Sequence, residues 1–293
     1  ARPPATRTGW RPGWPDRTGP IMTMVTVGRD QRPEGWSDGA AAYDEWFAPV
    51  SSRFAVNALR LLGLGPGQRL LDVAAGTGAL TLRAAEAGVD VAAVDFAPGM
   101  VRLLRQRLSD AGLVAQVEQM DGQALGFDSA SFDAVCSMFG LIFFPDLDAG
   151  ARELRRIVRP GGQVLVAAWD RSGFPLPAAV EQALQAVIPG LTRPAAPQPA
   201  LRVSDPASVE ALLARAGLRE VTVTEVTHDW IMPDPAALFR SLPHWAAPLR
   251  PAFDALEPSR RAQAAAAFAA IVTGMSHPAG GLPTTALFGH GLR

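Results

Sequence analysis

The sequence predicts an α/β protein whose core is a doubly wound sheet, mostly parallel with a final antiparallel strand. Between residues 69 and 169, short apolar runs alternate with helical segments, a rhythm typical of parallel strands joined by crossover helices. The first run leads through Asp72 into a turn of small residues at 74–78, and Ala79 begins the next helix. Such a turn places a polar ligand at the carboxyl end of a parallel strand.

The expected elements can be placed in chain order. Asp38 is expected to cap a helix that extends through Trp46 and Phe47, and a second helix is expected over 51–62. Strands are predicted at 69–74, 89–94, 114–119, 132–137 and 163–169, and helices at 79–87, 98–108 and 147–158. Pro98 suits a first helical turn, where its missing N–H is no loss.

The last third of the chain breaks this rhythm. Residues 174–202 are rich in Pro and Ala and are expected to be mostly irregular. A helix over 205–216, a strand over 220–226, a largely helical segment over 230–275 and a final strand over 284–292 are expected to follow. We interpret 174–202 and 230–280 as cap insertions, largely helical in the second, that roof the ligand edge of the sheet.

The first 38 residues show neither a strand nor a helix period and are rich in Pro, Gly, Arg and Thr. We interpret 1–38 as a disordered leader and 39–293 as the folded domain. No apolar signal segment stands in the first 40 residues, and the apolar stretch at 264–272 is too short to span a membrane.

Composition excludes several classes of partner and compartment. Of the 293 residues, 48% are hydrophobic and the net charge is −1, so a large core is expected, and nothing in the charge favours nucleic acid or an anionic membrane. Cys136 is the only cysteine, which excludes an internal disulfide and favours a reducing, cytoplasmic location. No cluster of His, Cys and carboxylates has metal-ligand spacing, so no metal is predicted.

Carboxylates follow successive predicted strands, and these strand ends share one edge of a parallel sheet. Gly76 and Gly78 allow backbone amides to approach a ligand, while Asp72 would attract a cationic or hydroxyl-bearing group and repel a pyrophosphate. Asp95 stands 17 residues after Gly78, near the spacing at which an acid reaches a ribose diol. Phe96 offers an apolar face for adenine, and Asp121 an acceptor for its amino group. These features favour a nucleoside that carries an ammonium group.

The assembly resembles the class I S-adenosylmethionine-dependent methyltransferases, which share a Rossmann-like fold, and most of all the ubiquinone/menaquinone-biosynthesis branch. The resemblance rests on Leu71–Gly78, Val94-Asp95-Phe96 with Met100, Asp121-Gly122, 131–135 and 153–162, which together with the segment from Tyr43 span residues 43–170. It implies S-adenosylmethionine as cofactor. It assigns the methionine moiety to Asp72 and the turn with Ala74, Gly76, Thr77 and Gly78, the ribose to Asp95, the adenine to Asp121 and Gly122, the junction with the acceptor to Ser137 and Phe139, and a closing aromatic ring to Tyr43.

Plainer roles remain open for some of these residues. Asp72 can be a helix cap, Asp121 can cap the short turn that follows it, and Tyr43 can be ordinary core. The loop at 139–146 contains no histidine, although many relatives carry one there, so a base at that position is in doubt. His244, and less so His228, is the candidate general base, although a structural histidine is the commoner role.

An apolar set in the expected roof predicts a hydrophobic pocket for a small, largely apolar acceptor. It comprises Phe239, Leu242, Trp245, Leu249, Phe253, Phe268 and Ile271, together with 141–144. The alternative function is a protein that binds S-adenosylmethionine without transferring its methyl group. An NAD-dependent dehydrogenase is disfavoured by Asp72 and by the absence of a third glycine after Gly78.

Overall fold

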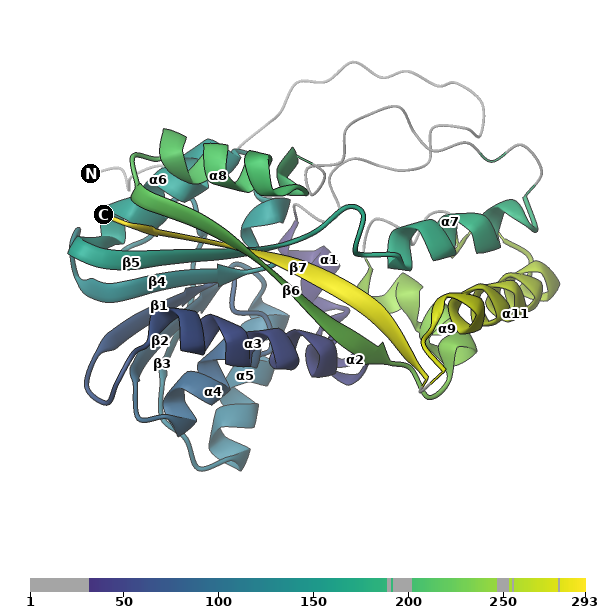
Figure 1. Cartoon of the computed structure of the whole chain (residues 1–293). Helices are drawn as coiled ribbons and strands as arrows, with labels where there is room; N and C mark the ends of the chain where they lie inside the picture. Colours follow the sequence, from purple (N-terminus) through teal and green to yellow (C-terminus); the bar gives the residue numbers. More distant parts are fainter. Residues whose placement is uncertain (1–31, 189–190, 192–201, 247–252, 255, 279) are drawn as a thin grey trace, which may run out of the picture.

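The computed structural model of the protein describes residues 32–188, 191, 202–246, 253–254, 256–278 and 280–293. Among these residues, seven strands form one sheet in the order β3-β2-β1-β4-β5-β7-β6 (Figure 1). The strands are β1 (Arg69–Val73), β2 (Asp90–Asp95), β3 (Gln116–Gln119), β4 (Phe132–Met138), β5 (Val158–Trp169), β6 (Arg219–Ile231) and β7 (Gly281–Leu292). β1 to β5 pair in parallel, whereas β7 pairs antiparallel with both β5 and β6. The predicted fold class, including the antiparallel final strand, is confirmed.

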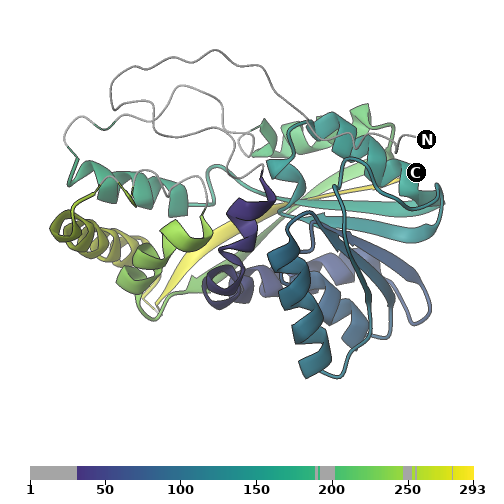
Figure 2. The ribbon, with the colours of Figure 1, turned by 180° about the vertical axis from the view of Figure 1, so that it is seen from behind.

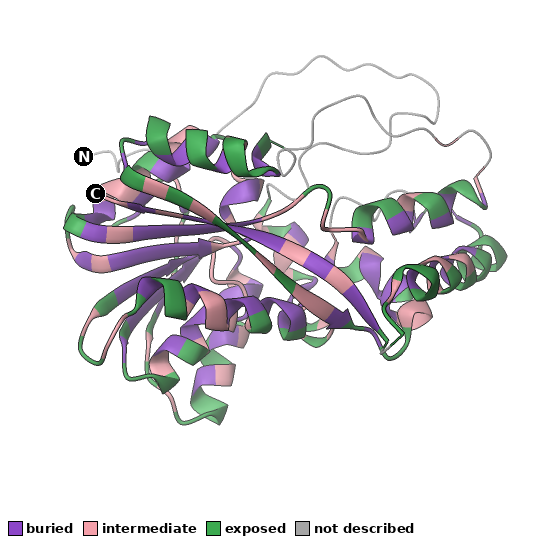
Figure 3. Ribbon diagram, viewed as in Figure 1, coloured by how far each residue is buried: buried purple, intermediate pink, exposed green. Residues whose placement is uncertain are grey.

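Helices cover both faces of the sheet because successive residues of a strand point to opposite faces. Leu70 packs in a core with α3 (Ala48–Leu62) and α4 (Ala79–Glu86), while its neighbour Leu71 packs in a second core with α6 (Leu147–Ile157) and α8 (Pro206–Arg215). A smaller core joins α5 (Pro98–Asp110) to β2 and β3. The central strands are therefore buried almost throughout, and the outward faces of the helices are exposed (Figure 3).

The strand order reverses at β1, whose two neighbours are β2 and β4. Ligands of doubly wound sheets bind at such a switch point, outside the carboxyl ends of the strands. The predicted first four strands agree with the structure to within two residues at each end. The fifth begins earlier than predicted, because the register shift opposite Phe132 lets Val158 join the ladder ahead of the turn at Gly161.

β6 and β7 are longer than predicted and form an arm that reaches beyond the sheet. The β5 pairing of β7 ends at Trp169 with Ala286, but β6 and β7 remain paired as far as Ile231 with Gly281. The arm carries α9 (Pro235–Trp245) and α11 (Pro258–Met275), and α7 (Leu176–Gln185) packs on α11 (Figure 1). The expectation that 174–202 is mostly irregular is therefore wrong at α7, while 189–190 and 192–201 lie outside the described residues. Helices from both predicted insertions pack together at the end of this arm, and we refer to α7, α9 and α11 as the cap.

Two short helices lie beside the carboxyl edge of the sheet at the start of the described chain. They are α1 (Pro33–Ser37) and α2 (Ala40–Trp46), and both contact α5 (Figures 1 and 2). Residues 33–37 had been assigned to the leader, and they are helical because Pro33 begins a turn whose Trp36 packs on the domain. The expected cap at Asp38 is wrong as well, since Gly39 is the N-cap of α2 and Asp38 ends α1. Residues 1–31 lie outside the described residues.

None of the described helices combines the length and the apolar composition that a membrane crossing requires.

Candidate functional site

The glycine turn lies where β1 ends and α4 begins, in the position that the sequence predicts. Gly76 and Gly78 have positive φ angles of 56° and 92°, and Gly78 is the N-cap of α4. A Cβ at Gly78 would lie 2.2 Å from Leu104 Cδ1, so a side chain there would displace the buried Leu104 side chain of α5, and Gly78 itself faces α5 and does not line the pocket. Ala74, at the start of the turn, has a φ of 57°, which costs a residue with a Cβ about 1–2 kcal/mol.

Asp72 lies at the inner end of this turn and is 1% exposed. Thr81 of α4 donates a hydrogen bond from Oγ1 to Asp72 Oδ2 at 2.7 Å. Burial raises the pKa of Asp72 to about 7, an effect that the Thr81 hydrogen bonds oppose and the charge of Asp95 reinforces. A carboxyl group at this balance point ionises readily when a cation arrives beside it.

Asp95, at the end of β2, fixes the turn from the other side. Its Oδ2 accepts the Gly76 amide at 2.8 Å and its Oδ1 accepts the Ala97 amide at 2.9 Å. Burial raises the pKa of Asp95 to about 6, against the lowering effect of these two hydrogen bonds. Each carboxylate oxygen can accept a second hydrogen bond, so holding the turn is compatible with the predicted binding of a ribose diol.

Tyr43, the only tyrosine of the chain, lies over the turn from α2. A Cβ at Gly76 would lie 3.8 Å from Tyr43 Cε1. Burial raises the pKa of the Tyr43 phenol above its ordinary value, while the Ser51 hydroxyl opposes the shift, so the phenol is protonated and can donate a hydrogen bond at neutral pH.

Tyr43 and Asp72 line a small, partly open pocket, around which about 330 Å³ of space is free of protein atoms, open solvent included. Its lining consists of Tyr43, Ser51, Asp72, Ala74, Ala75, Gly76, Thr77, Ala79, Leu80 and Met138. Four of the predicted cofactor residues besides Tyr43 are in this set, namely Asp72, Ala74, Gly76 and Thr77. Ser51 was not singled out from the sequence, and Met138 belongs to the stretch from Ser137 to Phe139 that the resemblance assigns to the junction with the acceptor. Ser51 carries no local signal because it lies in a helix far from the motif, whereas Met138 lies between two residues that were named.

The residues predicted for the nucleoside lie beside this pocket and do not line it. Met100 is 2% exposed and packs with Ala40 and Ala97, and Phe96 packs against the same cluster. Asp121 accepts the Gln123 amide at 2.9 Å, which is the turn-capping role that the sequence had left open. A Cβ at Gly122 would lie 2.3 Å from Phe144 Cζ, so the loop after β4 packs directly on this backbone.

Ser137 and Phe139 support the loop after β4 and are themselves buried. Ser137 Oγ accepts the Leu141 amide at 3.1 Å at the start of η1 (Leu141–Phe143). The Phe139 ring stacks on Trp169, with ring centroids 3.9 Å apart, and its φ of 59° turns the chain after the strand. Met138, between them, is the residue of this group that reaches the pocket.

The candidate bases do not line this pocket. His244 is exposed on α9. His228 bonds Asn57 Oδ1 through Nε2 at 2.8 Å, and burial and the nearby Arg53 lower the pKa of its imidazole. Within the described ranges, no group of three or more His, Cys, Asp or Glu could hold a metal ion.

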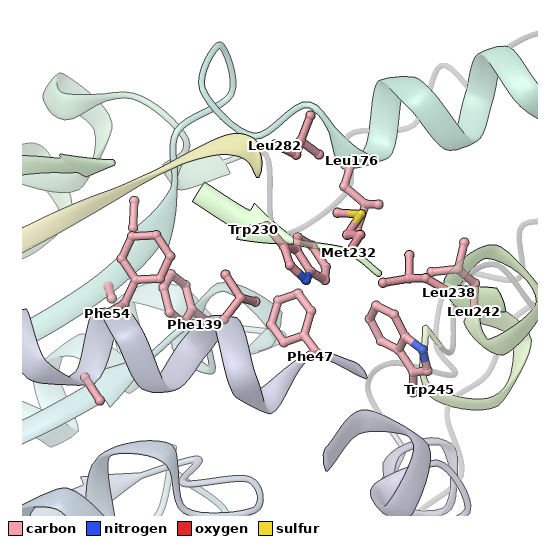
Figure 4. Close-up of a cluster of buried hydrophobic side chains, with 14 of the residues drawn as sticks. Phe47, Phe54, Phe139, Leu176, Trp230, Met232, Leu238, Leu242, Trp245 and Leu282 are labelled. Carbon is pink, nitrogen blue, oxygen red and sulfur yellow. The ribbon is translucent and has the colours of Figure 1, made fainter. Parts of the chain in front are cut away.

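The expected apolar roof is a packed core. Phe239 and Phe268 are fully buried, with ring centroids 5.2 Å apart, and Phe253 packs on Phe239. Leu242 and Trp245 continue this core toward Phe47 and Trp230 (Figure 4). Leu249 lies outside the described residues. The predicted wall of an acceptor pocket is therefore filled by side chains that contact one another.

Comparison with known proteins gives a consistent picture. A family model described as a methyltransferase domain matches residues 70–162. An uncharacterised protein of Mycobacterium tuberculosis is 39% identical over 47% of this chain and 48% of its own length, so the chain spans about half the length of the first curated relatives it matches. A demethylmenaquinone methyltransferase of Renibacterium salmoninarum is 35% identical over 64% of this chain and 81% of its own length.

Solved structures share the fold at low sequence identity. The YcgJ protein of Bacillus subtilis has a TM-score of 0.53 at 14% identity and covers 82% of this chain and 97% of its own. A phosphoethanolamine N-methyltransferase of Haemonchus contortus, in complex with phosphomonomethylethanolamine and S-adenosylhomocysteine, has a TM-score of 0.52 at 16% identity, over 82% of this chain and 52% of its own.

Proposed function

This chain belongs to the class I S-adenosylmethionine-dependent methyltransferases, in the branch that resembles demethylmenaquinone methyltransferase, and from that premise we propose that it transfers a methyl group to a small, largely apolar acceptor. The observation that carries the proposal is the pocket between Tyr43 and Asp72 over the glycine turn. It combines a buried carboxyl group, backbone amides at a helix N-terminus and an aromatic ring, the set that an amino-acid moiety with its own ammonium and carboxylate requires.

The residues present fit S-adenosylmethionine. Gly76 lines the pocket without a side chain, and the buried Asp72 has Thr81 as its polar partner but gains most from an ammonium group. In this proposal Asp72, Thr77 and the amides that begin α4 hold the methionine moiety. Asp95 holds the ribose, Phe96 borders the adenine, and Asp121 and Gly122 meet the edge of the adenine. The buried Met100 belongs to the cluster on which Phe96 packs and so supports Phe96.

S-adenosylmethionine supplies an electrophilic methyl group on a sulfonium, which needs no further activation. The task of the chain is to align the acceptor with that methyl group and to exclude water, and positioning alone can supply many kcal/mol. Met138 and Ser51 line the pocket from β4 and α3, outside the glycine turn, and are our candidates for the acceptor side. The apolar acceptor and the cytoplasmic compartment remain part of the proposal, the latter supported by the single, buried Cys136.

Calorimetry with S-adenosylmethionine, S-adenosylhomocysteine and NAD tests the cofactor, and an acceptor screen that measures S-adenosylhomocysteine release tests the reaction. Micromolar binding of the first two without NAD is expected. Asp95→Asn should weaken binding at least about tenfold by losing charge-assisted hydrogen bonds. Asp90→Asn, at the exposed opposite end of the same strand, is the matched control. Binding of NAD alone, or equal affinity in both variants, would overturn the assignment.

His244 stays a hypothesis as general base. Its removal should lower turnover at least about 100-fold if it takes the proton of the acceptor. Because the side chain is exposed on α9, we expect His244→Ala to change turnover less than about fivefold, which would leave reaction by positioning as the mechanism.

The alternative is a protein of this fold that binds the cofactor without methyl transfer. One solved structure at a TM-score of 0.50 and 18% identity, over 82% of this chain and 81% of its own, is named as a [4+2]-cyclase, SpnF, so the fold alone does not establish the reaction. Tight binding of S-adenosylmethionine without its consumption by any acceptor would favour this alternative.

A further inference from the structure

Arg107 of α5 bridges α2 to the glycine turn, although it lies outside every motif that the sequence suggested. Its Nη1 contacts Asp44 Oδ1 of α2 at 2.6 Å. The same nitrogen donates to the Thr77 carbonyl oxygen at 2.9 Å and approaches Thr77 Oγ1 at 3.3 Å. We call this set of contacts the Arg107 bridge.

One end of the Arg107 bridge is a pocket residue, and the other end directly follows one in the sequence. Thr77 is 1% exposed and lines the pocket, while Asp44 directly follows Tyr43, whose ring forms the opposite wall. The guanidinium therefore sets the distance between the two walls without itself lining the space. About a third of the Arg107 side chain and a quarter of the Asp44 side chain remain exposed (30% and 26%), so solvent can compete for the contact.

The helix that carries Arg107, α5, packs on the sheet, whereas α2 is short and depends on its neighbours. α5 packs on β2 and β3 through Leu104, Leu108 and Val101. α2 contains seven residues, too few to be stable alone, and depends on its packing against α9 and Phe47 and on the Arg107 bridge. The bridge contributes little to the free energy of unfolding, as do most partly exposed ion pairs. Its effect on where Tyr43 lies over the glycine turn does not depend on that contribution.

We propose that Arg107 is a positioning residue for cofactor binding, which holds Tyr43 closed over the glycine turn through Asp44 and fixes the Thr77 carbonyl. The identity of the ligand rests on the proposed function, whereas the contacts of Arg107 with Asp44 and Thr77 are independent of it. Breaking the bridge opens the pocket wall and solvates Tyr43, with little change in the folded core.

Tyr43 provides a reading that needs no cofactor, because it is the only tyrosine in the chain. Nitration by tetranitromethane at pH 8, followed by the absorbance of nitrotyrosine, measures its accessibility directly. In Arg107→Gln the nitration rate should rise about tenfold, since the open form gains population. S-adenosylhomocysteine affinity, measured by calorimetry, should fall about tenfold as well, the usual effect of losing a charge-assisted hydrogen bond.

Arg105→Gln is the matched control. Arg105 lies on the same helix and donates to the Val117 carbonyl of β3, so its loss removes a similar contact without touching α2. Arg107→Lys keeps the positive charge, but its side chain is shorter and its ammonium group reaches Asp44 and Thr77 less well, so it should fall between wild type and Arg107→Gln. Asp44→Asn removes only the α2 end of the bridge and leaves Arg107 on Thr77, so it should change both measurements in the same direction as Arg107→Gln but no further. The double variant should be no worse than Arg107→Gln, because that substitution already removes both contacts.

The proposal requires that both the nitration rate of Tyr43 and the affinity for S-adenosylhomocysteine change in Arg107→Gln. Nitration and affinity equal to those of Arg105→Gln would overturn it, and so would faster nitration with unchanged affinity, or additive effects in the double variant. If Arg107→Gln does not fold, Asp44→Asn decides by the same two readings. If wild type binds no S-adenosylhomocysteine, the proposed function fails, while the nitration series still decides whether the Arg107 bridge holds α2 closed.

Discussion

At the scale of single residues, the candidate site contains two carboxyl groups whose pKa values burial raises toward neutral pH. Asp72 and Asp95 both have raised pKa values, about 7 and about 6, chiefly because burial penalises their charged forms. Their hydrogen bonds from Thr81, Gly76 and Ala97 favour the charged forms and limit the shifts. The site is thus prepared for a ligand that brings positive charge and hydroxyl donors, and its affinity should depend on pH.

The affinity for S-adenosylmethionine should fall as pH decreases below about 7. The ionised Asp72 attracts the ammonium group, so protonation with a pKa of about 7 removes that attraction. The loss approaches about tenfold per pH unit for one group and steepens below about 6, where Asp95 also protonates. Calorimetry between pH 5.5 and 8.5, in buffers of different ionisation heat, checks this and counts the protons released. Asp72→Asn should keep only the lower break, and a flat profile in wild type would contradict the prediction.

Ala74→Gly should stabilise the protein. The positive φ of Ala74 costs about 1–2 kcal/mol relative to glycine, while glycine loses about 0.4–1 kcal/mol through its more flexible unfolded state. The net gain is about 0.5–1 kcal/mol, or a rise of roughly 2 °C in Tm. Ala75→Gly, at the neighbouring position without a positive φ, is the control and should lower the Tm measured by calorimetry. Equal losses in the two variants would show that strain at Ala74 is negligible.

The sequence predicts the residues of the turn well because their chemistry is local. Asp72, Gly76, Gly78 and Asp95 stand at fixed distances from strands that the apolar pattern reveals. Arg107 could not be found this way, since its partners Asp44 and Thr77 are 63 and 30 residues away and nothing local distinguishes it from the other arginines of the same helix.

At the scale of elements, the apolar pattern predicts the strands and helices of the sheet but does not separate pocket from core. From their spacing and apolar character, Phe239 and Phe268 could line a pocket or pack in a core, and in the structure both are completely buried. The lengths of β6 and β7 were underestimated for a related reason. Their outer halves, from Thr227 with Thr285 to Ile231 with Gly281, pair only with each other. A two-stranded arm with polar residues such as Thr227 and Asp229 lacks the alternation that a half-buried strand shows.

α2 packs backbone to backbone against the end of α9, and Gly39 permits that approach. A Cβ at Gly39 would lie 2.2 Å from the His244 carbonyl oxygen and 2.9 Å from Trp245 Cα. We expect Gly39→Ala to cost about 1–3 kcal/mol of stability by overpacking, and to weaken cofactor binding because α2 also carries Tyr43. Thermal unfolding and calorimetry measure the two effects.

The matched control for that change is Gly274→Ala in α11. No heavy atom lies within 4 Å of the added Cβ, so the alanine should raise stability by up to about 1 kcal/mol through helix propensity. A Gly39→Ala protein as stable as Gly274→Ala would show that α2 and α9 separate without cost, and would argue against a closed wall formed by these helices.

At the scale of the whole molecule, the pocket is closed by parts of the chain that lie outside the matched methyltransferase segment at 70–162. Tyr43 and Ser51 come from the preceding helices, and the cap on the β6–β7 arm supports α2 through α9. The segment that matches the methyltransferase model therefore supplies the glycine turn and the carboxylates Asp72 and Asp95. The segments that flank it supply the pocket wall formed by Tyr43 and Ser51. This division makes truncation informative, because each segment can be removed without cutting the sheet.

Removal of residues 1–31 and removal of residues 1–38 should have different effects. The shorter deletion follows from the prediction that the leader is disordered, and it should leave the Tm and the cofactor affinity unchanged. The longer deletion also removes α1, whose Trp36 packs on Phe143 at 5.1 Å between ring centroids and whose Ser37 Oγ accepts the Gly99 amide at 3.1 Å. Loss of that apolar contact should cost roughly 1–3 kcal/mol and weaken S-adenosylhomocysteine binding, because Trp36 also contacts Tyr43.

Calorimetric unfolding and titration of the two truncated proteins against the full chain measure both effects. Equal losses in the two would place an essential contact before residue 32, and no loss in either would remove α1 from the closed wall.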